Sequence, residues 1–291
     1  MRDYVIMTDS CADLTAEEVA QAGLTVVPLT YTMDGVSRLD TPDHAAMSAE
    51  EFYQHIRKGV VCSTSAVNVG DFADYMRPIL LSGKDILCIS FSSALSTTYQ
   101  SAVIAAEEVG KEFPDARIIV IDSLCASRGQ GMLVWYAAQE KAAGKTLDET
   151  AAWVRDNILR QDHWFTVADL GHLRRGGRLN ATSAIIGTVL AIKPILHVDD
   201  EGRLTPVSKA RGMKQALTGL VDKLEELGEP PFEGRTVFIS HSDAPDSVDF
   251  VKGLLKKRFG ITDVRVGYIG PVIGSHTGAG TLAFFFFGKK R

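Results

Sequence analysis

One segment near the C-terminal end of the chain surrounds a single histidine with four glycines. It runs from Gly270 to Gly280, reads GPVIGSHTGAG, and has His276 near its middle. Glycine lets the backbone approach a ligand closely and adopt positive φ values, so a histidine in this setting can meet an anion with little steric obstruction. The alternative is a tight turn in which the histidine only satisfies backbone groups.

Two clusters of hydroxyl side chains precede this segment. The first is Ser63-Thr64-Ser65, which directly follows the apolar run 60–62. A hydroxyl group can donate a hydrogen bond to a carboxylate or a phosphate while it accepts one from the backbone. The same cluster also suits the start of a helix near Val69, where a hydroxyl would cap the first turn. Anion binding and helix capping both stay open for these residues.

The second cluster holds five hydroxyls within the seven residues from Ser92 to Thr98. It follows an apolar run over 86–89 and precedes a stretch rich in alanine and glutamate. The start of a helix presents free N–H groups and the positive end of its dipole, which together attract anions. Because one helix cap needs fewer hydroxyls than this, we favour ligand binding over capping alone.

Arginines gather in a third segment, over residues 169–179. Arg174, Arg175 and Arg178 flank two adjacent glycines that suit a tight loop. A guanidinium group offers fixed, forked donors for a phosphate or a carboxylate. The alternative is a solvated basic loop, above all for Arg174 and Arg175. Lys193 adds a further cation at the start of a predicted strand.

Helices and strands have to position these segments, and the first half of the chain shows a regular alternation of the two. Short apolar runs alternate with helical stretches, which is the pattern of parallel βαβ units. Thr15 and Glu18 have the spacing of a capping box and mark a helix start. Ligands bind at the carboxyl ends of the strands in such sheets, so we expect a site among the polar residues that follow them. The predicted strands cover 4–7, 24–29, 86–89 and 117–121.

The alternation of strands and helices ends near residues 160–163. We predict a boundary between two domains there, at about residue 161. Residues 198–204 read as a hairpin turn, which indicates a mixed or antiparallel sheet beyond this point. The predicted elements of this half are strands over 164–167, 195–198, 203–207, 236–240 and 264–269, helices over 213–227 and 247–259, and a buried strand or strand end at 284–287.

The composition points to a soluble globular protein in the cytoplasm. The 291 residues carry a formal net charge of −5, and an acidic balance argues against a nucleic-acid partner, whose binding needs clustered positive charge. The four cysteines are widely spaced without a C-x-x-C pair, which argues against a metal site and suits a reducing compartment. We find no signal-peptide pattern and no apolar run of about 18 residues that would span a membrane.

Taken together, these segments resemble the DegV family of fatty-acid-binding proteins, which includes the FakB subunits of bacterial fatty acid kinase. Any single segment is a weak match, but the ordered set covers nearly the whole chain. The matching pieces are Thr8-Asp9-Ser10 with Asp13-Leu14, Ser63-Thr64-Ser65, Ser92-Ser93 with Ser96 to Ser101, Val120 to Ser123, Arg175 to Arg178, Lys193 to Leu196, and Gly270 to Gly278.

The resemblance implies an α/β fold in two parts. An N-terminal three-layer domain with a parallel sheet would cover residues 1–161, and a two-layer α/β domain with a mixed sheet would cover 162–291 and close over the ligand. A long-chain fatty acid would lie in a tunnel between them, and the apolar stretches 185–195 and 284–287 suit its chain. No metal and no cofactor is implied besides this bound fatty acid.

The resemblance also assigns roles to individual residues. Family members hold the carboxylate with a threonine, a serine at a helix start and the histidine of the glycine segment, and these roles fall on Thr64, Ser96 and His276. An arginine of the double-glycine loop lies near a partner kinase in the family, which points to Arg178, with Arg175 beside it. The residues expected to support the ligand site are Ser65, Ser93, Thr97, Gly274 and Thr277.

Two positions depart from the family pattern. Thr97 stands where the family usually has glycine, and Ala279 stands where it usually has proline. Thr97 adds bulk beside the carboxylate and can tilt or select the head group. Ala279 leaves the glycine segment less rigid, because it lacks the fixed φ of proline.

We therefore expect a non-catalytic carrier, which binds a long-chain fatty acid and presents its carboxylate to a separate kinase subunit for acyl-phosphate formation. Transient contact with a membrane is compatible with such a carrier. The enzymatic alternative is a phosphotransferase or hydrolase that acts on a small anionic substrate with the same Ser, Thr, His and Arg side chains. The absence of a G-x-S-x-G elbow and of a Walker loop argues against it. A regulatory ligand sensor is a third interpretation, which the sequence does not separate from a carrier.

Overall fold

The computed structural model describes residues 2–179 and 191–291. The first part of the chain builds a four-stranded sheet of parallel strands in the order β2-β1-β6-β7. Every residue of β6 is buried, as expected for a central strand of a parallel sheet that is covered on both faces. The strands are β1 (Tyr4–Asp9), β2 (Thr25–Val27), β6 (Asp85–Ser90) and β7 (Ile118–Asp122). The four strands predicted for this half are therefore confirmed.

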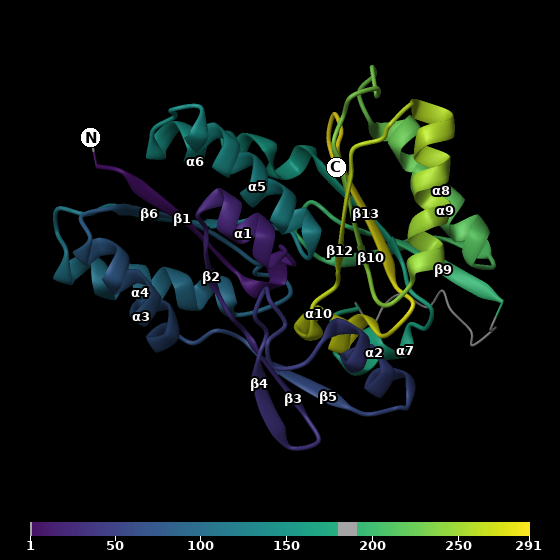
Figure 1. Cartoon of the computed structure of the whole chain (residues 1–291), viewed down its shortest axis with the longest axis horizontal. Helices are drawn as coiled ribbons and strands as arrows, with labels where there is room; N and C mark the ends of the chain where they lie inside the picture. The colour runs from purple at the N-terminus through teal and green to yellow at the C-terminus, as the bar shows by residue number, and fades with distance from the viewer. Residues whose placement is uncertain (1, 180–190) are drawn as a thin grey trace.

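Helices cover both faces of this sheet and make three layers, as predicted (Figure 1). One face carries α3 (Val69–Leu81) and α4 (Thr98–Glu112), and the other carries α5 (Arg128–Ala142) and α6 (Leu147–Asn157). Helix α1 (Ala16–Ala22) begins with the predicted capping box. Thr15 Oγ1 accepts a hydrogen bond from Glu18 N at 3.2 Å, and Thr15 N donates to the Glu18 carboxylate at 3.0 Å.

The rest of the chain builds a six-stranded sheet in the order β10-β9-β8-β13-β11-β12. Strands β11 and β12 are parallel and the other neighbours are antiparallel, so the predicted mixed sheet is confirmed. The predicted hairpin joins β9 to β10. The strands are β8 (Gln161–Thr166), β9 (Ile192–Val198), β10 (Leu204–Arg211), β11 (Val237–His241), β12 (Val264–Tyr268) and β13 (Leu282–Phe287).

Helices pack on this second sheet from two sides. The predicted helices α8 (Met213–Leu227) and α9 (Pro245–Phe259) cover the side that faces away from the N-terminal part (Figure 1). Helix α5 contacts β8, β11 and β13 and also belongs to the first part, so it joins the two sheets. Strand β8 begins at Gln161, where the domain boundary is expected. Helix α5 packs on strands from before and from after residue 161. The division into two domains therefore stays a prediction.

A third, antiparallel sheet has the order β4-β3-β5 and projects from one end of the molecule (Figure 1). It consists of β3 (Thr30–Met33), β4 (Val36–Leu39) and β5 (Cys62–Ser65), with α2 (Ala49–Arg57) between β4 and β5 in the chain. The hydroxyl cluster 63–65 lies in β5 and caps no helix. Helix α3 is capped by Asn68, whose side chain accepts from Asp71 N at 2.9 Å, so the capping alternative for this cluster is wrong.

The glycine-rich segment is helical, which makes the tight-turn alternative wrong as well. Helix α10 spans Pro271–Thr277, because proline suits the first helical position and Gly278, at a φ of 75°, ends the helix. Arg174 and Arg175, for which a solvated basic loop was the alternative, lie in the short helix α7 (Gly171–Arg175), and the two adjacent glycines follow it. Short 3₁₀ helices cover Ser10–Ala12 and Ile158–Arg160.

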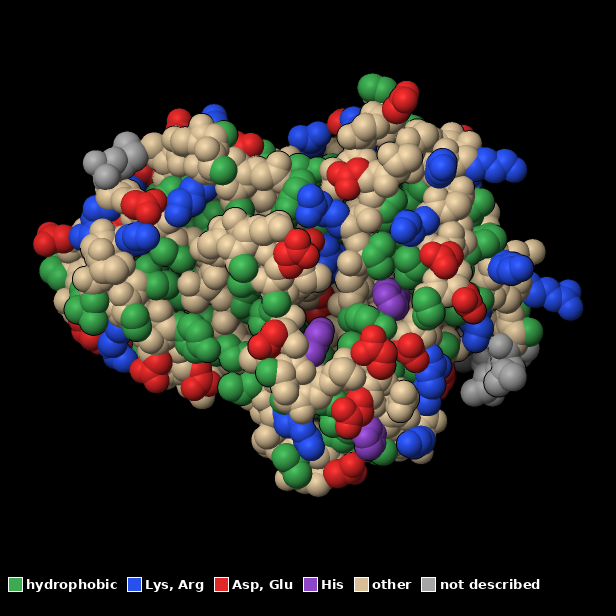
Figure 2. All heavy atoms as spheres, in the orientation of Figure 1, with side chains coloured by type: hydrophobic (Ala, Val, Ile, Leu, Met, Phe, Trp, Pro, Cys, Tyr) green, Lys and Arg blue, Asp and Glu red, His purple; other side chains and the backbone are tan. Residues whose placement is uncertain are grey.

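Acidic and basic side chains are interspersed over the face seen in Figure 2. Within the described parts of the chain, no helix is both long enough and apolar enough to cross a membrane. Of the apolar stretch predicted to suit a fatty acid chain, residues 185–190 lie outside the described residues. The remainder enters β9.

Candidate functional site

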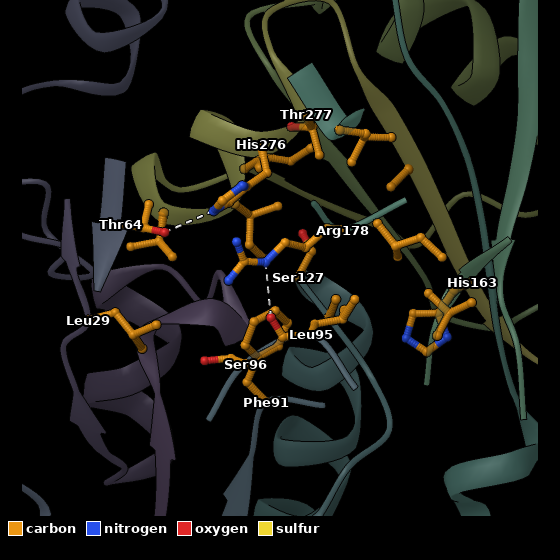
Figure 3. Close-up of a pocket in the computed structure, with 18 of the residues that line it drawn as sticks. Leu29, Thr64, Phe91, Leu95, Ser96, Ser127, His163, Arg178, His276 and Thr277 are labelled. Carbon is orange, nitrogen blue, oxygen red and sulfur yellow. Dashed lines mark hydrogen bonds between the residues drawn. The ribbon is translucent and has the colours of Figure 1, made fainter. Parts of the chain in front are cut away.

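A cavity of about 380 Å³ lies where the three sheets approach one another. Its walls come from β5, from the loops that follow β6 and β7, from α10, and from β8, β9 and β13 of the mixed sheet (Figure 3). The loops after β6 and β7 stand at the carboxyl ends of parallel strands, which is the position predicted for a ligand. The fold therefore gathers residues from distant parts of the sequence around one space.

Most residues of the cavity wall are apolar. They include Phe91, Leu95, Phe165, Val198, Leu204 and Phe285. Of the four phenylalanines predicted to border an acyl chain, Phe285 lines the cavity, while Phe284 and Phe286 are buried in the core beneath α8 and α9. This division follows from the alternation of side chains along a strand. A wall of this kind favours an extended apolar ligand.

A polar pair occupies one part of the wall. Thr64 Oγ1 and His276 Nε2 form a hydrogen bond of 2.8 Å (Figure 3). Thr64 comes from β5, and His276 comes from the last turn of α10, so the pair exists only because the small sheet and the C-terminal helix meet. The fold thus brings together two of the residues that the resemblance assigns to a carboxylate, through a contact that the sequence did not predict.

The imidazole of His276 is neutral at neutral pH. Burial, with a smaller contribution from the nearby Arg178 guanidinium, lowers the pKa of His276 to about 4. A neutral imidazole carries one N–H donor and one acceptor nitrogen. A carboxylate placed beside it would favour the charged form and raise this pKa.

Ser96 lies in the loop before α4, close to the start of that helix. Its Oγ accepts a hydrogen bond from Thr98 N at 3.2 Å and lies 2.8 Å from Thr98 Oγ1. The side chain is half-buried and lines the cavity. Ser96 thus helps to shape the start of α4 and presents its hydroxyl to the cavity. Capping and ligand binding are compatible here.

Arg178 lines the cavity as well, and its guanidinium folds back over the loop. Nε donates to the Leu95 carbonyl at 3.2 Å (Figure 3), and Nη1 donates to the Gly176 carbonyl at 2.6 Å. The residue is nonetheless exposed, so it stands at the boundary between cavity and solvent. Arg175 is exposed on α7 and does not line the cavity. Of these two arginines, only Arg178 lines the cavity.

Four of the five residues expected to support the ligand site line the cavity, namely Ser65, Ser93, Thr97 and Thr277. Ser93 and Thr97 are exposed. Gly274 does not line the cavity. It faces α2, where an added Cβ would overlap the Tyr53 hydroxyl. Its role is therefore to let α10 approach α2 closely.

Ser127 borders the cavity at the start of α5 and was not predicted. Its φ of 54° is unusual for a residue with a side chain. Its Oγ donates to the Asp13 carboxylate and lies 2.8 Å from Ser240 Oγ. Such a backbone conformation is held by its surroundings, and no local sequence pattern announces it.

Two buried aspartates hold the first turn of α10. Asp13 Oδ1 accepts from Gly270 N at 2.9 Å, and Asp40 Oδ2 accepts from Val272 N at 3.3 Å. Burial raises the pKa of Asp13 to about 7 and that of Asp40 well above its usual range. Their oxygens satisfy backbone N–H groups that the start of a helix leaves without a partner inside the helix. This arrangement positions the helix that carries His276.

His163 also lines the cavity and was not predicted. It lies on β8, is 1% exposed, and has Phe285 edge-on at 5.4 Å between ring centroids. Among the described residues, no group of three or more His, Cys, Asp and Glu side chains is arranged to hold a metal ion.

The sequence matches known proteins over its whole length. A family model described as uncharacterised protein, DegV family, matches residues 3–289. A DegV domain-containing protein of Clostridium perfringens is 42% identical over 291 residues, which cover 100% of this chain and 99% of that protein. A DegV domain-containing protein of Lactococcus lactis is 39% identical over 287 residues, covering 99% and 98% of the two chains.

Solved structures show the same similarity. A fatty-acid-binding DegV family protein from Thermus thermophilus superposes with a TM-score of 0.87 at 31% identity, covering 99% of this chain and 100% of that one. A DegV lipid-binding protein from Thermotoga maritima gives a TM-score of 0.86 at 29% identity, covering 99% of both chains.

Proposed function

Because the chain belongs to the DegV family, we propose that its cavity binds a long-chain fatty acid. The observation that carries this proposal is an apolar cavity with the neutral Thr64–His276 pair in its wall. Its volume of about 380 Å³ falls within the roughly 300–1,000 Å³ of small-molecule pockets. Each CH₂ group that such a cavity buries contributes about 0.8 kcal/mol.

The head group of the fatty acid would lie against Thr64, His276 and Ser96. Ser96 Oγ can donate to a carboxylate oxygen. The hydrogen bond between Thr64 and the neutral His276 uses one of their two protons, so this pair offers one further donor, either the hydroxyl or an imidazole N–H. Thr277 supports this placement, because it lines the same cavity and its Oγ1 has no hydrogen-bond partner among the described residues. The carboxylate would thus be held by neutral donors.

The enzymatic alternative finds less support in this geometry. A threonine next to a histidine can form a nucleophile and base pair, and Thr64 and His276 have the required contact. However, a general base works best with a pKa near the operating pH, and the pKa of His276 is about 4. The pair is better suited to holding a ligand than to removing a proton at neutral pH.

We further propose that the protein presents the carboxylate to a separate kinase. Arg178 supports this role, because it is exposed yet lines the cavity on the side of the Thr64–His276 pair (Figure 3). A guanidinium at that boundary can pair with the negative charge of a phosphate during transfer. The exposed Arg175 would contribute to the partner contact from α7.

Displacement of a fluorescent fatty acid tests the binding proposal. Oleate and palmitate should displace the probe, whereas short carboxylates such as acetate should not, because they lack the apolar chain. Equal displacement by acetate and oleate, or displacement by neither, would contradict it.

A further inference from the structure

The cavity has a second polar group that the carboxylate site does not use. His163 lies on β8, away from the Thr64–His276 pair (Figure 3). Its side chain is 1% exposed and lines the cavity. The surrounding wall is apolar, with Phe165 on the same strand and Phe285 against the imidazole ring.

The imidazole of His163 lacks hydrogen-bond partners. Neither Nδ1 nor Nε2 has one among the residues that the structure describes. Burial lowers the pKa of His163 well below its usual value, and the positive charge of Arg291 acts in the same direction, while an interaction with the Gln161 backbone, which does not reach hydrogen-bond geometry, opposes them. The ring is therefore neutral, with one N–H donor and one acceptor nitrogen, both without a partner.

Neighbouring polar groups are already occupied. The Gln161 side-chain amide donates to the Gly129 carbonyl and accepts from Cys125 Sγ. Arg291 Nε donates to the Gln161 carbonyl, and Nη2 donates to Cys125 Sγ. A Cβ added at Gly129 would overlap His163 Nε2, so this nitrogen packs against the backbone of α5. These contacts leave Nδ1 as the nitrogen that a group in the cavity can pair with.

We propose that His163 recognises a hydroxyl or oxo group on the chain of the bound fatty acid, at a distance from its carboxylate. A hydroxyl matches either tautomer of the neutral imidazole, because it can both donate and accept. A buried polar group that stays unpaired is unfavourable, and a site built to bond a hydroxyl discriminates against the analogue that lacks it. This inference rests on the proposed fatty acid site and specifies its ligand class.

A panel of hydroxystearates, differing only in the position of the hydroxyl, tests this with unmodified protein. Stearate and each isomer compete with a fluorescent fatty acid. We expect at least one isomer with a mid-chain or distal hydroxyl to bind about tenfold more tightly than stearate. Wild-type protein that binds stearate at least as tightly as every isomer would overturn the inference, since a bound water would then suffice for His163.

Variants test whether His163 causes the preference for a hydroxystearate over stearate. His163→Leu removes both ring nitrogens and should abolish the preference, whereas Phe165→Leu, on the same strand and in the same cavity, should weaken stearate and the hydroxystearates alike. A preference that persists in His163→Leu would also overturn the inference. Failure of stearate and of all isomers to bind would instead contradict the fatty acid site itself, so the two failures are distinguishable.

Discussion

The carboxylate of Asp13 accepts a hydrogen bond of 2.9 Å from the backbone N–H of Gly270, which immediately precedes α10. Its other oxygen accepts from Ser127 Oγ at the start of α5. Asp13 therefore connects the helix that joins the two sheets to the helix that carries His276. The position of the imidazole relative to Thr64 depends on this connection.

Replacing Asp13 with asparagine should change how stability depends on pH. Burial raises the pKa of Asp13 from 3.8 to about 7, so the folded protein retains a proton that the unfolded chain loses above about pH 4. The protonated Asp13 therefore stabilises the fold fully below about pH 4, and this stabilisation is lost as the pH rises to about 7. The free energy of unfolding falls by at most about 4 kcal/mol over this range. Asp13→Asn should remove the part of this pH dependence that Asp13 causes. The measurement is the free energy of unfolding in urea between pH 4 and pH 7.

The exposed aspartate of α6, Asp156, provides the control for this experiment. Asp156→Asn makes the same change at an exposed position, so it shows what the loss of an aspartate does without the buried contacts of Asp13. Parallel curves for wild type and Asp13→Asn between pH 4 and pH 7 would show that Asp13 does not hold a proton in the folded protein.

Thr64→Val and Ser96→Ala should each weaken fatty acid binding without unfolding the protein. Ser96→Ala removes a donor to a buried carboxylate, and Thr64→Val removes the hydroxyl that pairs with His276. The loss of a buried hydrogen bond typically costs about 1–3 kcal/mol. Displacement assays measure the affinity and thermal melting measures the stability. Thr32→Val is the matched control, because Thr32 is on the adjacent strand β3 and does not line the cavity. If Thr64→Val and Ser96→Ala behaved like Thr32→Val, the head-group assignment would be wrong.

His276 should make binding depend on pH. In the free protein its pKa is about 4, and a neighbouring carboxylate would raise it. Binding should then take up a proton, so the affinity should increase as the pH falls from 7 toward 5. His276→Gln keeps a donor but has no titrating group, and its affinity should change less over this range. Identical pH profiles for the two proteins would exclude proton uptake by His276.

Arg178→Ala should separate lipid binding from phosphorylation. The carboxylate retains Thr64, Ser96 and His276 as donors, so the affinity for fatty acid should change little. Acyl-phosphate formation with a cognate kinase should fall strongly, and Arg178→Lys should not restore it fully, because lysine lacks the bidentate geometry.

Arg178 also bonds the carbonyls of Leu95 and Gly176, so a purely structural role has to be tested on the same variant. That role predicts an equal loss of binding and turnover together with a lowered melting temperature. Either this outcome or unchanged turnover would contradict the proposed contact with the kinase.

The regular α/β elements of this fold could be predicted from the sequence because their signals are local. The apolar run of β6 and the capping box of Thr15 and Glu18 each contain the relevant pattern within a few residues. The small antiparallel sheet could not, since β5 reads Cys-Ser-Thr-Ser and has no apolar run. Its strands are defined by pairing with β3 rather than by their own composition.

The residues of the site also divide into those that the sequence could predict and those that it could not. The segments that hold Thr64, Ser96 and His276 could be predicted from two hydroxyl clusters and a glycine-rich stretch, and the family resemblance selected the residues within them. The structure places all three around one cavity. Ser127 and His163 could not, because their importance lies in a backbone conformation and in missing partners that appear only in three dimensions. Gly274 was assigned to the ligand, whereas its contact is with Tyr53 of α2.

Mass spectrometry of an organic extract tests the central claim most directly. The protein is purified without added lipid, and the extract is compared with that of a denatured, delipidated and refolded sample before and after incubation with oleate or palmitate. The fatty acid site predicts a long-chain fatty acid, with or without a chain hydroxyl, in an amount close to that of the protein. An extract free of acyl chains, together with no uptake of either added acid, would contradict it.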